Sequence, residues 1–155
     1  MYFIYICPGE YSKSLPMFNK ETEYAIRALV YIQQQNLSGR RPGIIEITQE
    51  IEAPQFFTAK ILQRLVRQGF IQSVKGKGGG FYFDNEKPEL SLRELVFATE
   101  GANTFSDCGF GLKQCNEANP CPLHHQYAPI RDAYNRLIRE ETVQSLARKS
   151  YSKNL

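Results

Sequence analysis

The sequence predicts a mainly α-helical protein that carries one small β-hairpin. Apolar residues recur at helical spacing in several segments. A glycine-rich run from Lys75 to Gly80 separates two short β-prone segments, as the tip of a hairpin would. A long segment from residue 122 onward carries a single apolar stripe. Together these features predict a winged helix-turn-helix domain followed by a long C-terminal dimerisation helix.

Composition limits the number of domains and the class of protein. The 155 residues, of which 42% are hydrophobic, suffice for one core of roughly 100 residues and an extension. No apolar run approaches the roughly 20 residues that span a bilayer, and the first residues lack the basic flank of an export signal. We therefore expect a cytoplasmic protein with no membrane partner. The net charge of +3 suits nucleic acid only if the cations collect on one face.

The first three helices are expected in residues 17–87, after an extension over residues 1–16 that shows no sustained periodicity. Asn19 is a plausible N-cap for a helix from about residue 20 to about residue 35. A short second helix is expected over residues 44–51. The third begins at Pro54, buries Ile61, Leu62 and Leu65, and ends before Gly69. This order is typical of a helix-turn-helix, and the β-prone segments 70–74 and 81–83 would form its wing.

A linker helix, a loop and the dimerisation segment follow the wing. Ser91 and Glu94 form a capping box that opens a helix within residues 88–101, and Gly101 closes it. Residues 102–121 lack periodicity, and a loop of this length is usually functional or disordered. Residues 122–155 are expected to form the dimerisation helix and a C-terminal tail. Pro129 interrupts the long helix, and Thr142 is a candidate cap for a short last helix. The long helix has one apolar stripe, which nothing else in the chain would cover fully, and this predicts a homodimer. The stripe consists of Tyr127, Ile130, Tyr134, Leu137 and Ile138.

The outward face of the third helix has the chemistry of a DNA-recognition helix. Exposed cations on a helix are more often a solvated face, but adjacent aromatic residues cannot both face the core, and the exposed one needs a partner. Gln55 can pair with an adenine edge, Lys60 with guanine or a phosphate, and Phe57 with a thymine methyl. We therefore expect a double-stranded DNA operator as partner and the following contact residues on this helix: Gln55, Phe56, Phe57, Lys60, Arg64 and Arg67.

The wing supplies the second set of DNA contacts. Lys75 and Lys77 lie among glycines, and Gly78 and Gly79 have no side chain to keep backbone amides away from a phosphate or the minor groove. A glycine-rich tip taken alone is more often merely flexible. The order of helix-turn-helix, wing and linker helix favours DNA binding over that alternative.

Three of the four cysteines cluster in the loop, whereas Cys7 stands apart. Cys108, Cys115 and Cys121 have the spacing C-x6-C-x5-C, and zinc sites usually use shorter C-x2-4-C hooks. Thiolates favour iron–sulfur clusters as well as zinc, so the spacing favours a cluster, [2Fe-2S] or [4Fe-4S], over zinc or three ordinary thiols. His124 follows Cys121 by three residues and is within reach as a fourth ligand.

Over residues 17–149 the sequence resembles the Rrf2 family of bacterial transcription factors. The resemblance rests on residues 23–29, on the segment 60–69 that leads into the glycine-rich run, on the helix from Leu92, and on the three-cysteine loop before a long helix. It implies a homodimer that binds an approximately palindromic operator. It also implies three cysteine ligands and a non-cysteine fourth, which is either His124 or Glu23 of the partner subunit. The first cysteine gap is longer than the family pattern.

The function expected from these residues is a sequence-specific transcriptional regulator, a repressor, whose iron–sulfur cluster senses redox state, nitric oxide or cluster supply. A metal-free or zinc-bound regulator of the same family that a protein partner controls remains an alternative. A thiol redox enzyme or cluster carrier is a second one, but the chain has no C-x-x-C and no phosphate-cradling motif between a strand and a helix. We therefore expect no enzymatic activity.

Overall fold

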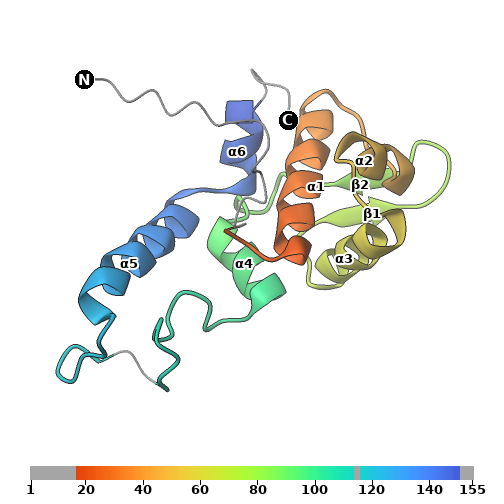
Figure 1. Cartoon of the computed structure of the whole chain (residues 1–155). Helices are drawn as coiled ribbons and strands as arrows, with labels where there is room; N and C mark the ends of the chain where they lie inside the picture. The colour runs from red at the N-terminus through yellow and green to blue at the C-terminus, as the bar shows by residue number, and fades with distance from the viewer. Residues whose placement is uncertain (1–16, 114–115, 151–155) are drawn as a thin grey trace, which may run out of the picture.

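The structure, a computed structural model, describes residues 17–113 and 116–150. Within these ranges it is mainly helical with one two-stranded antiparallel sheet, as expected from the sequence (Figure 1). No helix in the described ranges combines the length and the apolar character that crossing a bilayer requires. The elements in chain order are α1 (Lys20–Leu37), α2 (Ile44–Glu50), α3 (Gln55–Arg67), β1 (Gln72–Val74), β2 (Gly80–Tyr82), α4 (Leu92–Glu100), α5 (His124–Glu140) and α6 (Val143–Ser150).

The first helix begins at its predicted N-cap and ends at Leu37, close to the end expected at about residue 35. The side chain of Asn19 accepts a hydrogen bond of 2.8 Å from the backbone N–H of Thr22, which satisfies one of the free amides of the first turn. The chain leaves the helix through Ser38 and Gly39, and Gly39 has a φ of +74°. Between these ends α1 contributes a fully buried stripe to the core: Ala25, Ala28, Leu29 and Ile32.

The helices α2 and α3 and the hairpin complete what we call the reading head, residues 20–82. Leu62 and Leu65 of α3 are fully buried, and Gly69 ends that helix with a φ of +78°, as predicted. The strands pair Gln72 with Tyr82 and Val74 with Gly80. β1 has three residues, fewer than the segment 70–74 expected, and β2 has the expected three but begins one residue before the segment 81–83. Ile71 and Phe83, at the ends of the ladder, are buried in the core.

The linker helix α4 opens with the predicted capping box. The Glu94 N–H donates to Ser91 Oγ at 3.2 Å, and the Ser91 N–H donates to Glu94 Oε2 at 3.1 Å. The backbone N–H of Gly101, at the C-terminal end of α4, donates to the carbonyl of Phe97. Leu92, Leu95 and Val96 are buried and extend the core of the reading head.

The last two helices take different directions. α5 runs away from the reading head, whereas α6 returns and packs along α1 (Figure 1). Val143 and Ala147 of α6 are fully buried in the same core as the α1 stripe. Thr142 caps α6 as predicted, since its Oγ1 accepts from the Ser145 N–H at 2.9 Å. The sequence did not predict that this short helix belongs to the core of the reading head.

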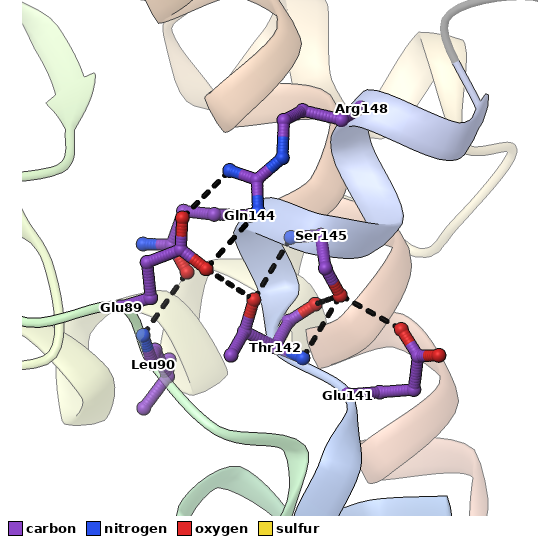
Figure 2. A network of polar contacts seen from close by, with 7 residues as sticks. All are labelled: Glu89, Leu90, Glu141, Thr142, Gln144, Ser145 and Arg148. Carbon is purple, nitrogen blue, oxygen red and sulfur yellow. Dashed lines mark hydrogen bonds and ion pairs between the residues drawn. The ribbon is translucent and has the colours of Figure 1, made fainter.

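A junction of backbone and side-chain hydrogen bonds attaches α6 to the segment before α4 (Figure 2). The Leu92 N–H donates to the carbonyl of Glu141, and the Val143 N–H donates to the carbonyl of Leu90, both at 2.9 Å. The Leu90 N–H donates to Gln144 Oε1 at 3.0 Å, a buried contact. The two segments therefore meet as a short antiparallel bridge.

Candidate nucleic-acid interface and cysteine loop

The exposed face of α3 is a stripe of four residues that we call the α3 stripe: Phe56, Lys60, Gln63 and Arg67. Their spacing of four, three and four residues keeps them on one side of a helix with 3.6 residues per turn. The opposite side carries the buried residues of α3: Thr58, Ile61, Leu62 and Leu65. Gln55 begins the helix and is exposed, and α3 contains no acidic residue. This face can therefore approach a polyanion without a repelling carboxylate on its own helix.

Phe57 and Arg64, both expected at the DNA surface, each contact a side chain of α1. The ring of Phe57 meets the ring of Tyr24 edge to face, with centroids 6.0 Å apart. Arg64 forms an ion pair with Glu21. The structure thus separates the two adjacent aromatics, because Phe57 is 40% exposed and packed against Tyr24 whereas Phe56 is 75% exposed. The charge of Arg64 is already balanced within the chain.

The hairpin tip presents Lys75, Lys77 and Gly78 to solvent. Gly79 has a structural reason to be glycine, since a Cβ there would lie 2.2 Å from the carbonyl oxygen of Val74. A groove of about 520 Å³ runs between α3 and the hairpin. Gln63 and Arg67 line it from α3, and Lys75 lines it from the wing. The two predicted contact surfaces therefore meet in one concave basic region.

Arg41 is a basic residue of this region that the sequence analysis did not select. Its guanidinium carbon lies 4.3 Å from the centroid of the Tyr82 ring on β2. The Phe81 N–H donates to the carbonyl of Pro42 at 3.0 Å, which joins the loop before α2 to the wing. A Cβ at Gly80 would lie 2.2 Å from the Arg41 carbonyl oxygen, so this approach requires glycine there. The sequence shows Arg40 and Arg41 as a pair, but only the fold places Arg41 beside the hairpin.

The cations of this region differ from one another in their partners. Arg40 pairs with Glu46 at 2.7 Å, and Arg64 pairs with Glu21. In contrast, no carboxylate of the described residues lies within ion-pair distance of five exposed cations: Arg41, Lys60, Arg67, Lys75 and Lys77. Unpaired cations on one face are the electrostatic requirement for binding a phosphate backbone.

Two of the three predicted cysteine ligands lie together in the structure. The sulfur atoms of Cys108 and Cys121 are 3.5 Å apart, although 12 residues separate the two cysteines in the sequence. This distance is longer than the roughly 2.05 Å of a disulfide. Cys115 and Cys7 lie outside the described residues. The structure therefore brings the two ends of the predicted ligand set into contact.

The Cys108 thiol lies in an environment that favours the thiolate. A hydrogen bond from the backbone N–H of Phe110 lowers the pKa of this thiol below its ordinary value of 9.0, against the opposing effect of burial. The backbone N–H groups of Leu112 and Gly111 and the thiol of Cys121 lower the pKa further. Cys108 is itself buried. A turn of amides around a buried sulfur can stabilise a thiolate ligand.

The two candidates for a fourth ligand have different surroundings. His124 is buried at the start of α5, and its backbone N–H donates to the carbonyl of Cys121 at 3.0 Å. Glu23 lies on α1 and pairs with Lys20 of its own helix at 2.6 Å. Within the described residues, no group of three or more His, Cys, Asp and Glu side chains is placed to hold a metal. Cys115 is outside the residues to which this applies.

The apolar stripe of α5 is covered only in part by its own chain. Ile138 is fully buried, and the ring of Tyr134 stacks on Phe105 with centroids 5.0 Å apart. The chain itself therefore covers these two residues of the stripe. Ile130 and Leu137 are 54% and 39% exposed. They line an open hollow of about 400 Å³ together with Pro129, Ala133 and Tyr134.

Comparisons with known proteins identify the family of the chain. Residues 18–149 match the family model Rrf2, described as iron-dependent transcriptional regulator. A protein of Aquifex aeolicus assigned as an HTH-type transcriptional regulator is 26% identical over 132 residues, which cover 84% of this chain and 90% of that protein. The HTH-type transcriptional regulator NsrR of Bacillus subtilis is 24% identical, over 82% of this chain and 87% of its own.

The fold is similar to a solved structure as well. CymR, the global cysteine regulator of B. subtilis, superposes with a TM-score of 0.69 at 15% identity, covering 87% of this chain and 98% of that chain. This likeness supports the winged-helix arrangement of the described elements. Because the family model extends over most of the sequence, the chain belongs to the Rrf2 family and is a transcriptional regulator.

Proposed function

We propose that the chain is a cytoplasmic, homodimeric repressor that binds operator DNA through the α3 stripe and the wing, and whose affinity depends on an iron–sulfur cluster. The observation that carries the DNA-binding part is the set of unpaired cations on one face, where α3 and the hairpin flank a common groove. Cationic side chains that contact the DNA phosphates supply affinity, whereas side chains at the start of a recognition helix supply sequence preference.

The division between these roles can be measured with two variants. Gln55→Ala removes a group expected at a base edge, so it should cost roughly 1–3 kcal/mol on the operator alone. Lys75→Ala removes an unpaired wing cation, so it should weaken operator and random DNA alike and reduce the slope of affinity against salt by about one. Titrations at several salt concentrations measure both effects. Equal losses on both DNAs for both variants would contradict this division of roles.

The donor set around Cys108 supports a thiolate-bound iron group. A tetrahedral metal with bonds of about 2.3 Å holds two sulfurs about 3.8 Å apart, close to the 3.5 Å between Cys108 and Cys121. In this proposal Cys108, Cys115 and Cys121 are the thiolate ligands of a [2Fe-2S] or [4Fe-4S] cluster. A bound cluster supplies a group that redox reagents and nitric oxide can alter. The amides of the turn around Cys108 would hold its thiolate ready for that group.

Anaerobic purification with absorbance, iron, sulfide and zinc analysis tests the cluster. The parent protein should be coloured and contain iron and sulfide, and each of Cys108→Ala, Cys115→Ala and Cys121→Ala should lose the visible absorbance. Cys7→Ala is the matched control and should retain it. Zinc without sulfide would instead support the zinc-bound regulator. A colourless protein without metal, with identical operator affinity under anaerobic and oxidising conditions, would support a partner-controlled regulator.

The fourth ligand can be assigned with the same measurement. His124 is favoured by its burial and by its contact with Cys121 at the end of the loop. Glu23 of the partner subunit could serve only in a dimer that brings the first helix of one protomer to the loop of the other. Loss of absorbance in His124→Ala with retention in Glu23→Ala supports the former assignment. The reverse result supports the latter.

The proposed dimer uses the part of the α5 stripe that the chain leaves uncovered. Ile130 is 54% exposed in an open apolar hollow, and a second copy of α5 is an occupant that would bury it. Ile130→Asp should shift sedimentation toward the monomer. Ile45→Asp on α2, where the parent side chain is 58% exposed, is the matched control and should leave the oligomeric state unchanged. A parent protein that sediments as a monomer at micromolar concentration would contradict the dimer.

A further inference from the structure

Phe56 is the most exposed large hydrophobic side chain that the structure describes, at 75%. It lies in the first turn of α3, where a recognition helix approaches the bases. The adjacent Phe57 does not share this exposure, because it packs against Tyr24 of α1. A ring that is three-quarters exposed and has no aromatic contact within the part of the chain that the structure describes, unlike the 40% exposed Phe57, calls for a specific apolar partner.

Lys60 determines what kind of partner fits. Its ammonium lies 4.3 Å from the centroid of the Phe56 ring, one helical turn further along the same stripe. The cation covers one face of the ring and leaves the rest of it open. α3 has no acidic residue, and Gln63 and Arg67 continue the stripe. The partner of Phe56 must therefore offer an apolar group within a strongly negative surface.

The major groove of DNA offers one such group. Thymine is the base with an apolar substituent at its major-groove edge, the 5-methyl group, and phosphates flank it on both sides. We propose that Phe56 is a specificity-determining residue that contacts a thymine methyl group, and that Lys60 is a positioning residue that holds the ring in place. This inference rests on the proposed DNA-binding function. It replaces Phe57 by Phe56 as the residue that recognises thymine.

Uracil substitution isolates this contact, because 2′-deoxyuridine differs from thymidine in DNA only by the missing methyl group. Full-length protein first selects a preferred duplex from a random pool. Each thymine of that duplex is then replaced in turn, and dissociation constants are measured for the parent and for Phe56→Ala. The parent should lose about fourfold at one thymine per half-site, equivalent to about 0.8 kcal/mol for one apolar carbon. Phe56→Ala should bind both duplexes equally.

Further variants separate recognition from positioning and from folding. Phe56→Leu keeps an apolar contact and should retain part of the preference for thymine. Lys60→Arg keeps a cation over the ring and should retain the preference for thymine over uracil. Lys60→Gln removes the cation and should reduce this preference at the same position of the duplex. Phe57→Leu changes the neighbouring aromatic residue and is the matched control. It should leave the ratio of the dissociation constants for the thymine and uracil duplexes unchanged. Circular dichroism should show unaltered folding of Phe56→Ala, because the ring is exposed.

The outcomes distinguish this inference from the function on which it rests. Salt-dependent binding of a selected duplex, with no thymine whose methyl group matters, overturns the role of Phe56 and leaves the regulator intact. Equal sensitivity of the parent and Phe56→Ala to every uracil also overturns it. If no duplex is selected and binding does not depend on salt, the proposed DNA-binding function itself fails.

Discussion

The helices α3 and α5 differ in how many of their residues are buried. α3 has 13 residues and buries four of them, whereas α5 has 17 residues and buries only His124 and Ile138. α3 packs against α1 and α2 inside the reading head, and α5 extends from it (Figure 1). The comparison indicates that the part of the chain proposed to contact DNA is held by its own core. The exposed apolar residues of α5 fit the proposal that a second copy covers them.

The largest expected effect contrasts a core residue of α3 with an uncovered residue of α5. Leu62→Ala should lower the free energy of unfolding by about 3 kcal/mol at any protein concentration, because Leu62 is fully buried. Leu137→Ala should affect the fold of the protomer little but make the melting temperature less dependent on protein concentration than in the parent, since it weakens the proposed dimer. Denaturation at two protein concentrations measures both. Losses of similar size that do not depend on concentration would contradict the contrast.

A smaller effect is expected where α6 attaches to the reading head. Gln144→Ala removes the acceptor of the buried Leu90 N–H, and an unsatisfied buried amide costs about 2 kcal/mol. Urea unfolding measures the loss. Gln126→Ala on the exposed side of α5 is the control and should change the free energy of unfolding by less than about 0.5 kcal/mol. If Gln144→Ala is equally neutral, α6 is not held by this contact.

The elements of the reading head could be predicted because their signals are local. Asn19, Ser91 and Thr142 each bond an amide within three residues, so a cap can be recognised in the sequence alone. Gly69 likewise marks the end of α3 through a conformation that its own backbone adopts. Such features do not depend on where the rest of the chain goes, which is why helix and hairpin positions agreed with expectation.

The remaining features depend on residues far apart in the sequence. Helical spacing places Phe56, Phe57 and Arg64 outward on α3, but only the packing of α1 shows that Tyr24 and Glu21 engage the last two. The return of α6 to α1 has the same origin, because an eight-residue apolar pattern does not specify its partner. For the candidate metal site, the spacing in the sequence identified the three cysteines as candidate ligands. The contact between Cys108 and Cys121 depends on the path of the loop, which the spacing does not specify.

The capping box of α4 should contribute less than the buried contact of Gln144. Ser91→Ala removes the acceptor of the Glu94 N–H, and the loss of an N-cap typically costs about 1 kcal/mol. Ser91→Asp can accept the same hydrogen bond and should restore most of the stability. Urea unfolding of the three proteins compares them. A rescue by Ser91→Asp separates the cap from other effects of the substitution, whereas equal losses in both variants would show that the cap contributes nothing.

The smallest effect is expected at the exposed edge of the junction, where Arg148 binds Glu89 at 2.6 Å (Figure 2). The hydrogen bond from Arg148, and then that from Thr142, lowers the pKa of Glu89 below its ordinary value of 4.5. A carboxyl group with a lowered pKa in the folded state adds stability above its unfolded pKa and loses it as the pH falls through the folded pKa. Both side chains are largely exposed, so solvent screens the pair and its contribution is small.

Arg148→Ala should therefore destabilise the protein slightly at about pH 7, and the difference from the parent should vanish as the pH falls well below 4.5. Urea unfolding across this range measures the difference. Glu89→Gln is the control, because it keeps a hydrogen-bonding side chain but cannot titrate, and Arg148→Ala in that background should show no dependence on pH. A difference that stays constant down to acidic pH would mean that Arg148 stabilises α6 by packing of its side-chain stem and not by its charge.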